Sequence, residues 1–157
     1  MPRKYESTEK FLRPDPLFQS RLVSRFINCV MSDGKKSTAQ AVVYEAFDLL
    51  KKKIPDREPL DAFNEAIENV KPMVEVRSRR VGGATLQVPH EVKRTRQQSL
   101  AIRWILDGAR GKKGKPMAKR LAEELFDAFN KQGLAYTKRE NTHKMAEANE
   151  AFAHFAW

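Results

Sequence analysis

The sequence predicts a mainly α-helical, single-domain protein, a bundle of about six helices with one protruding β-hairpin. Apolar residues recur at helical spacing along most of the chain, whereas residues 73–89 alternate with the period of two that is typical of β-strands. The length of 157 residues suffices for one domain with a substantial core and hardly for two. An apolar content of 41% indicates a globular rather than a disordered protein, so residues 1–157 are expected to form one domain.

Three helices are expected before the hairpin. Residues 22–31 carry an apolar stripe at helical spacing, and Gly34 follows it as a helix-ending residue. Residues 39–50 carry a second stripe, which ends in three lysines whose charge suits the carboxyl end of a helix dipole. Residues 60–70 form the third, closed before Pro72 because proline cannot continue a helix.

Residues 73–89 are predicted to form a β-hairpin arm. Val74 and Val76 alternate with charged residues, and Gly82-Gly83 supplies the positive φ angles of a tight turn. Pro89 lacks the N–H group of a ladder, so it marks the edge or the end of a strand. A lone hairpin is marginal in water, and this one carries three arginines, so we expect an acidic partner that contains phosphate. The alternative is a solvated connector with incidental arginines.

Three more helices are expected after the hairpin. Residues 99–106 centre the fourth, with Leu100 and Trp104 one turn apart. Pro116 opens the fifth, in the first turn where proline is tolerated. The sixth is expected from about residue 139 towards residue 155. Its inward residues are predicted to be Met145, Ala148 and Phe152.

Charge is unevenly distributed along the chain. The net charge is +10, and residues 93–120 hold ten basic residues against one acidic residue. Residues 45–69 hold seven acidic against four basic residues. Such segregation indicates a binding face, and a positive excess favours nucleic acid or an anionic membrane as the partner. No apolar run is long enough to span a membrane, and we expect no membrane partner.

Two basic loops precede helix starts, at residues 33–37 and 110–115. Helix N-termini attract phosphate because free N–H groups and the helix dipole both point there. The first loop contains Gly-Lys, but Cys29 stands where a nucleotide-binding P-loop needs its first glycine. The alternative for each loop is a solvated surface turn. The lysines of the two loops are Lys35, Lys36, Lys112, Lys113 and Lys115.

Cysteine and histidine usage argues against disulfides, metals and catalysis. Cys29 is the only cysteine, so no internal disulfide forms, which suits a reducing cytosol or organelle matrix, and it is expected to be a small core residue. The three histidines share no ligand spacing, and the carboxylates of Asp15, Asp33 and Glu75 show no pairing for acid–base work. We therefore predict no catalytic residue, no metal and no cofactor, and not an enzyme.

Several sequence blocks are long and specific. They are GKK at residues 34–36, ENVKP at residues 68–72, EVRSRRVGGA at residues 75–84, QVP at residues 87–89 and MAEAN at residues 145–149. Together they resemble the small-subunit ribosomal protein S-seven family in its bacterial or plastid form, and the resemblance covers nearly the whole chain.

The resemblance implies a structural constituent of the small ribosomal subunit. It would bind small-subunit rRNA as a primary binder and nucleate assembly of the 3′ major domain, the head. Its hairpin would lie at the subunit interface, near exit-site tRNA and the mRNA exit path. Neighbouring small-subunit proteins of the head and platform, and its own messenger RNA, are further implied partners. The location would be the ribosome, in the cytoplasm or in an organelle stroma or matrix.

The resemblance also assigns roles to residues of this sequence. Arg3, Lys4 and Lys10 belong to a basic N-terminal extension, residues 1–15. The implied rRNA-binding residues are Arg3, Lys4, Lys10, Lys35, Lys36, Arg94, Arg96, Lys112, Lys113 and Lys115. The implied hairpin residues near tRNA and mRNA are Arg77, Arg79, Arg80, Gly82 and Gly83.

Some positions depart from the family pattern. Leu86 stands where an aromatic residue is common, Ala156 replaces a basic residue, and Tyr136-Thr137 lies in a stretch usually richer in lysine. These departures weaken the C-terminal helix as an RNA contact. Two other interpretations share the charge and the hairpin: a free-standing RNA chaperone or messenger-binding regulator, and an architectural DNA-binding protein.

Overall fold

The computed structural model describes residues 8–155 of the chain. Within them the protein is mainly helical, with one two-stranded antiparallel sheet. The elements, in order, are η1 (Thr8–Phe11), α1 (Arg21–Val30), α2 (Lys36–Lys53), α3 (Pro59–Val70), β1 (Val74–Val81), β2 (Ala84–Glu91), α4 (Arg94–Gly111), α5 (Met117–Phe129), α6 (Gly133–Ala148) and η2 (Glu150–Phe155), where η denotes a 3-10 helix.

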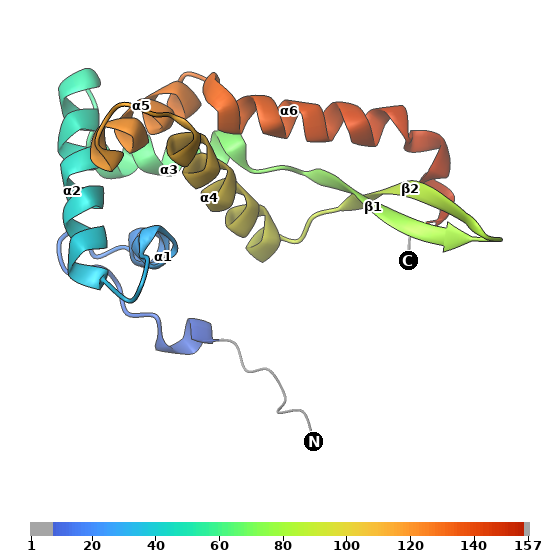
Figure 1. The fold of residues 1–157 in the computed structure, drawn as a ribbon, viewed down its shortest axis with the longest axis horizontal. Helices are drawn as coiled ribbons and strands as arrows, with labels where there is room; N and C mark the ends of the chain where they lie inside the picture. The colour runs from blue at the N-terminus through green and yellow to red at the C-terminus, as the bar shows by residue number, and fades with distance from the viewer. Residues whose placement is uncertain (1–7, 156–157) are drawn as a thin grey trace.

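Helices α1 to α5 form a block at one end of the molecule, and α6 runs away from it beside the hairpin (Figure 1). The core of the block is centred on three fully buried aromatic rings from α1, α2 and α3. The rings of Phe26 and Phe63 lie 5.1 Å apart, as do those of Phe47 and Phe63. Deleting one such ring typically costs about 3–5 kcal/mol of folding free energy, so these contacts fix the relative positions of the helices.

The six expected helices are present, and the apolar stripes of α1 to α5 face this core. The Oγ atom of Ser20 accepts a hydrogen bond from the Val23 N–H at 3.4 Å and caps α1. Pro59 stands in the first turn of α3, where its missing N–H costs nothing. Asp33 and Gly34, with φ of 53° and 73°, turn the chain from α1 into α2. No helix within residues 8–155 is long and apolar enough to cross a membrane.

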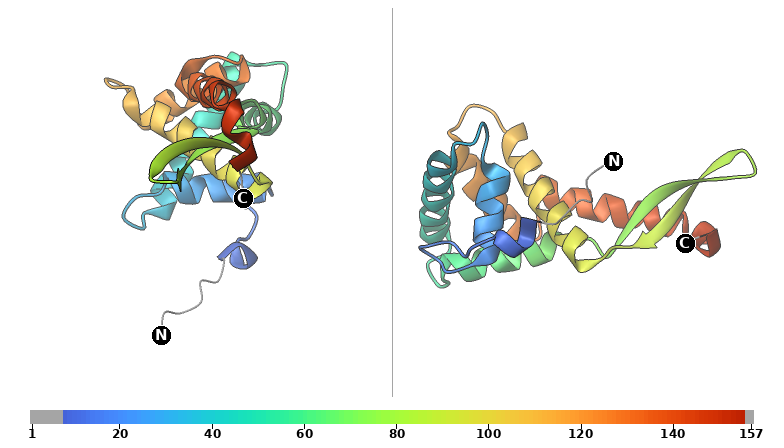
Figure 2. Two further views of the ribbon diagram at one scale, coloured as in Figure 1. Left: turned by 90° about the vertical axis from the view of Figure 1, so that its right-hand side faces the viewer. Right: turned by 90° about the horizontal axis from the view of Figure 1, so that it is seen from below.

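The hairpin follows the predicted turn. Gly82 and Gly83 both have positive φ, 56° and 87°, as a primed hairpin turn requires, and Val81 pairs with Ala84 across it. The arm extends past the end of α6 (Figure 2). Pro89 does not end the strand, as one alternative allowed, because it pairs with Val76 inside β2. Its missing N–H is tolerated since each strand of a two-stranded sheet has an open edge.

The expectation for the last helix is wrong in its start and in its inward face. Helix α6 begins at Gly133 and ends at Ala148, and the 3-10 helix η2 follows it. Met145 is 54% exposed and Ala148 is also exposed, whereas Ala135 and Ala146 are buried. Because α6 packs on the hairpin and the helical block along one narrow side, small residues occupy the contact and the larger Met145 faces solvent.

Cys29 is also wrongly predicted as a core residue. It is exposed, because Val23, Phe26 and Ile27 carry the buried face of α1. The protein atoms that still surround its thiol raise the pKa of Cys29 by desolvation, which outweighs the lowering effect of nearby arginines. The thiol is therefore the stable form at neutral pH, and Cys29 lacks the activation of a nucleophile.

Candidate nucleic-acid interface

A buried carboxylate anchors the base of the hairpin to α4. Glu75 is only 7% exposed, and both of its oxygens accept hydrogen bonds from Arg96 Nε, at 2.8 and 2.9 Å. Arg77 Nε donates to the same carboxylate at 2.8 Å. Burial opposes the charge of Glu75, but the hydrogen bonds from the two arginines outweigh it and lower the pKa. Two of the predicted RNA-binding arginines thus also hold the arm in place.

The remaining hairpin arginines lie nearer the turn and point differently. Arg79 Nη1 donates to the backbone carbonyl of Phe155, which ties the arm to η2. Arg80 is exposed, and its place in the strand puts it on the opposite face from Arg77 and Arg79. The three arginines predicted as one set therefore lie on two faces of the strand; Arg77 and Arg80 are exposed and Arg79 is half-buried.

The α1–α2 loop presents two exposed lysines, Lys35 and Lys36, at the start of an 18-residue helix. Within residues 8–155 no carboxylate pairs with either ammonium group. The loop lies at the opposite end of the long axis from the hairpin tip (Figure 1). Both lysines are therefore open to a ligand, and the phosphate-binding role of the loop stays a prediction.

The α4–α5 loop is held by carboxylates of α5. Lys112 Nζ lies 2.9 Å from Oε2 of the fully buried Glu124 and 3.1 Å from Oδ2 of Asp127. Burial opposes the charge of Lys112, but both carboxylates raise its pKa. Lys115 pairs with Glu123 at 2.5 Å. Of the three predicted lysines, Lys113 alone is exposed and without an ion pair among the residues that the structure describes.

A groove between α1 and α4 carries arginines that the sequence prediction missed. It encloses about 400 Å³ and is lined by Arg25, Arg103 and Arg110 around Cys29. Arg25 Nη2 donates to Ser99 Oγ at 2.9 Å. Arg103 and Arg110 follow Arg96 at intervals of seven residues, two helical turns each, which places them on one face of α4. From that spacing, a row of arginines on one face of α4 could have been predicted.

The other predicted residues lie at separate places on the surface or outside the described part. Arg94 is exposed in the first turn of α4. Lys10 is exposed, with its Nζ 5.0 Å from the centre of the Phe11 ring. Arg3 and Lys4 lie outside the described residues. Between residues 8 and 155 no group of three or more His, Cys, Asp and Glu side chains is arranged to hold a metal ion.

Comparison with known proteins decides the family. The family model described as Ribosomal protein S7p/S5e matches residues 2–150. The chain belongs to this family. It is 57% identical to the small ribosomal subunit protein uS7 of Nitratiruptor sp., over 99% of both chains. It is 59% identical to uS7 of Rhodopirellula baltica, over 96% of this chain and 97% of that one, and 54% identical to uS7 of Pelagibacter ubique over the full length of both.

Family membership confirms the resemblance that the sequence blocks indicated. The protein is a structural, non-enzymatic component of the small ribosomal subunit. That subunit is a ribonucleoprotein particle that takes part in translation. The observed architecture, a helical block with one projecting hairpin, agrees with the predicted fold class.

Proposed function

We propose that this protein is a primary rRNA-binding protein that nucleates assembly of the 3′ major domain, the head of the small subunit. The observation that carries the proposal is the distribution of positive charge. Exposed cations stand on the α1–α2 loop, on α4 and on the hairpin. A packed core holds the helices at fixed separations, and the hydrogen bonds between Glu75 and Arg96 hold the base of the hairpin against α4. A protein that orders RNA needs several such cationic groups at defined distances.

The mechanism follows from the chemistry of these side chains. Contacts from lysine and arginine to phosphate provide most of the affinity, so binding weakens as salt rises. The deep major groove of an RNA helix is closed to side chains, so specificity comes from the shape of the folded RNA. Only an RNA whose helices place phosphates opposite all the basic patches can bind all of these patches at once.

The hairpin has a separate role in this proposal, near exit-site tRNA and the mRNA exit path. Its base is buried against the helices at Glu75 and Val88, whereas residues 78–87 contain no buried residue. The tip therefore does not stabilise the core and is available to RNA that arrives during translation. The proposal also includes the neighbouring proteins of the head and platform as partners, and autoregulatory binding to its own messenger.

The first experiment measures binding of the purified protein to a folded 3′ major domain rRNA fragment across a salt series. Duplex DNA of equal length and an unrelated structured RNA serve as competitors. We expect binding that survives excess competitor and has a salt dependence indicating several phosphate contacts. Equal displacement by every polyanion would contradict specific rRNA recognition and favour a general nucleic-acid-binding protein.

A matched pair of double variants tests the α1–α2 loop. Replacing Lys35 and Lys36 by alanine should lower the affinity for the rRNA fragment and reduce the salt slope by about one for each phosphate that is no longer bound. Replacing Lys51 and Lys52 by alanine removes the same charge from the other end of α2. If both variants weaken binding equally, net charge and not the loop determines the affinity.

A further inference from the structure

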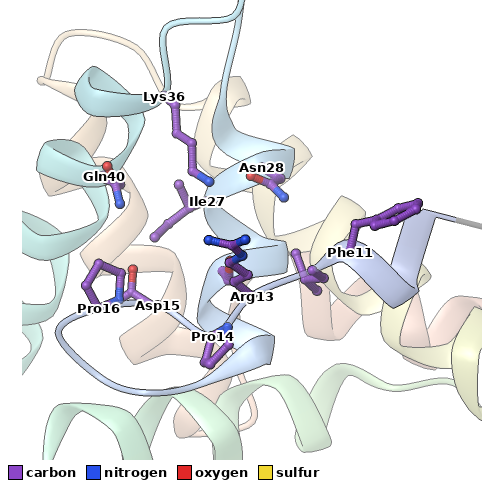
Figure 3. A pocket seen from close by; sticks show the side chains of 11 residues that line it. Phe11, Arg13, Pro14, Asp15, Pro16, Ile27, Asn28, Lys36 and Gln40 are labelled. Atoms are coloured by element: carbon purple, nitrogen blue, oxygen red, sulfur yellow. The ribbon is translucent and has the colours of Figure 1, made fainter.

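A pocket of about 370 Å³ lies between the N-terminal segment and helices α1 and α2 (Figure 3). Residues 11–16 form one wall, Asn28 and Ile27 come from α1, and Lys36 and Gln40 come from α2. Of the residues that line the pocket, only Lys36 is among the predicted RNA-binding residues. Its size falls within the range of small-molecule pockets, about 300–1,000 Å³.

Polar groups from three elements converge in this pocket. Figure 3 shows the ends of Arg13, Asn28 and Lys36 directed towards the same space. Among residues 8–155 no carboxylate pairs with Arg13 or Lys36. Two cations that face each other repel, and an anion placed between them relieves that repulsion. The pocket therefore fits a phosphate group.

The one carboxylate that lines the pocket already accepts hydrogen bonds from other groups of the protein. Asp15 Oδ2 accepts hydrogen bonds from the N–H groups of Leu17 and Phe18, each at 3.1 Å. Asp15 Oδ1 accepts from Tyr44 Oη at 2.8 Å. Burial and this aspartate raise the pKa of Tyr44 to about 12, so the phenol remains a donor at neutral pH. Asp15 thus fixes the chain that forms the wall and makes no ion pair with Arg13 or Lys36.

The rest of the lining suits a nucleobase. Asn28 carries an amide group, which provides both a donor and an acceptor, as the polar edge of a base requires. Gln40 adds a second amide, which also hydrogen-bonds to the phenol of Tyr44. The exposed ring of Pro16 offers apolar contact for a face of the base. Phe11 stands at the rim and is 72% exposed, which leaves its ring available to stack on an adjacent base.

The shape of the pocket excludes a stacked helix. An RNA duplex presents its phosphates on a convex surface and buries its bases, so it cannot fill a concave pocket, whereas an unstacked nucleotide can. We propose that this pocket binds a single unstacked nucleotide of the rRNA, with its phosphate on Arg13 and Lys36 and its base edge on Asn28 and Gln40. This inference rests on the proposed rRNA-binding function and adds a base-reading site to it.

The test separates base contact from phosphate contact with the same 3′-domain rRNA fragment. Asn28→Ala should lower the affinity about tenfold without changing the salt slope, because it removes a neutral hydrogen-bonding group. Arg13→Ala should lower the affinity and reduce the slope by about one. Asn141→Ala, an exposed asparagine on α6, is the matched control and should bind like the unmodified protein. Unchanged affinity of the Asn28 variant overturns the proposal.

Chemical probing of base edges then identifies the nucleotide. We expect at least one unpaired base to be protected by the unmodified protein and by the Asn141 control, and exposed again with Asn28→Ala. Replacing that nucleotide by an abasic one should weaken binding of the unmodified protein and cost the Asn28 variant much less. If the Asn28 and Asn141 variants protect the same bases, the assignment of the pocket is wrong, and the proposed rRNA binding is not affected by that result. Absence of specific rRNA binding by the unmodified protein contradicts the proposed function itself.

Discussion

Glu124 is the most deeply buried charged side chain that the structure describes, with 0% of its surface exposed. Its Oε1 accepts a hydrogen bond from the Ala135 N–H at 2.9 Å, and its Oε2 pairs with Lys112. A Cβ atom at Gly108 would lie 2.7 Å from Glu124 Oε1, which explains a glycine in the middle of α4. One carboxylate thus joins α4, α5, the start of α6 and a basic loop.

Replacing Glu124 by alanine is expected to destabilise the protein by about 3 kcal/mol, because it leaves Lys112 and the Ala135 N–H without their buried partner. Urea unfolding followed by circular dichroism measures the change. Glu123→Ala on the same helix removes only the partly exposed pair with Lys115 and should cost about 1 kcal/mol or less. Equal losses in the two variants would contradict a special role for the buried carboxylate.

His143 should make part of the stability dependent on pH. Its Nε2 accepts a hydrogen bond from the Met73 N–H at 3.1 Å, which only the neutral ring can do. Burial, followed by the nearby charge of Arg139, lowers the pKa of His143. The unfolded chain, with a pKa of about 6.5, therefore takes up the proton first, and the contribution is complete above that pH and lost as the pH falls below it.

The measurement is the free energy of unfolding between pH 7.5 and pH 5.5, a window of about one unit on either side of the unfolded pKa, for the unmodified protein and for His143→Gln. We expect the unmodified protein to lose more stability over this interval, so that the difference between the two proteins shrinks as the pH falls. His90 and His154 remain in both proteins and cancel in the comparison. Parallel pH curves would show that protonation of His143 is not linked to folding.

At the scale of elements, the hairpin is divided into an anchored base and an independent tip. The base is fixed by the buried Glu75 and its two arginines, and η2 contacts β2 further along the arm. Beyond Arg77 and its partner Val88, neither strand contributes a buried residue. The arm can therefore be shortened at its tip with little effect on the folding stability of the protein.

Shortening the arm tests that separation. Removing residues 78–81 and 84–87 deletes four complete cross-strand pairs and keeps Gly82-Gly83 as the turn. We expect the helical circular-dichroism signal to remain and the free energy of unfolding to fall by only about 1 kcal/mol, because no buried residue is removed and the tie that is lost is the hydrogen bond from Arg79 to the Phe155 carbonyl. Affinity for the 3′-domain rRNA fragment should also persist.

The complementary change is Glu75→Gln at the base, which keeps the arm but removes the charge that binds Arg77 and Arg96. It should destabilise the protein more than the shortened arm does, since a buried carboxylate loses the charge that holds its two exposed arginine partners. A shortened protein that unfolds more easily than the Glu75 variant would contradict the division into base and tip.

The elements themselves were predictable from the sequence, but many of their contacts were not. All six helices were expected, five of them because core-facing residues repeat at helical spacing, and Gly82-Gly83 located the turn. The inward face of α6 was wrong because Ala146, one residue from Met145, makes the contact. The pairing of Glu75 with Arg96 joins residues 21 positions apart, and no local pattern reports such a contact.

At the scale of the whole molecule, much of the positive charge gathers in two groups of side chains on different elements. The α1–α2 loop carries Lys35 and Lys36, and the α1–α4 groove carries Arg25, Arg103 and Arg110. Among the described residues, no carboxylate bridges the two loop lysines to Arg103 or Arg110. If each group binds its own phosphates, their contributions to rRNA affinity should be independent, because side chains that share no partner usually act additively.

The last prediction combines two double variants, Lys35→Ala with Lys36→Ala, and Arg103→Ala with Arg110→Ala. Each should lower the salt slope of rRNA binding by about one for every phosphate left unbound, and the quadruple variant should lose the sum of both binding free energies to within about 0.5 kcal/mol. Titrations of the unmodified protein and the three variants at several salt concentrations provide these values. A quadruple variant no weaker than one double variant would mean that the two groups bind the RNA alternately, and a rigid frame that engages both at once would then be wrong.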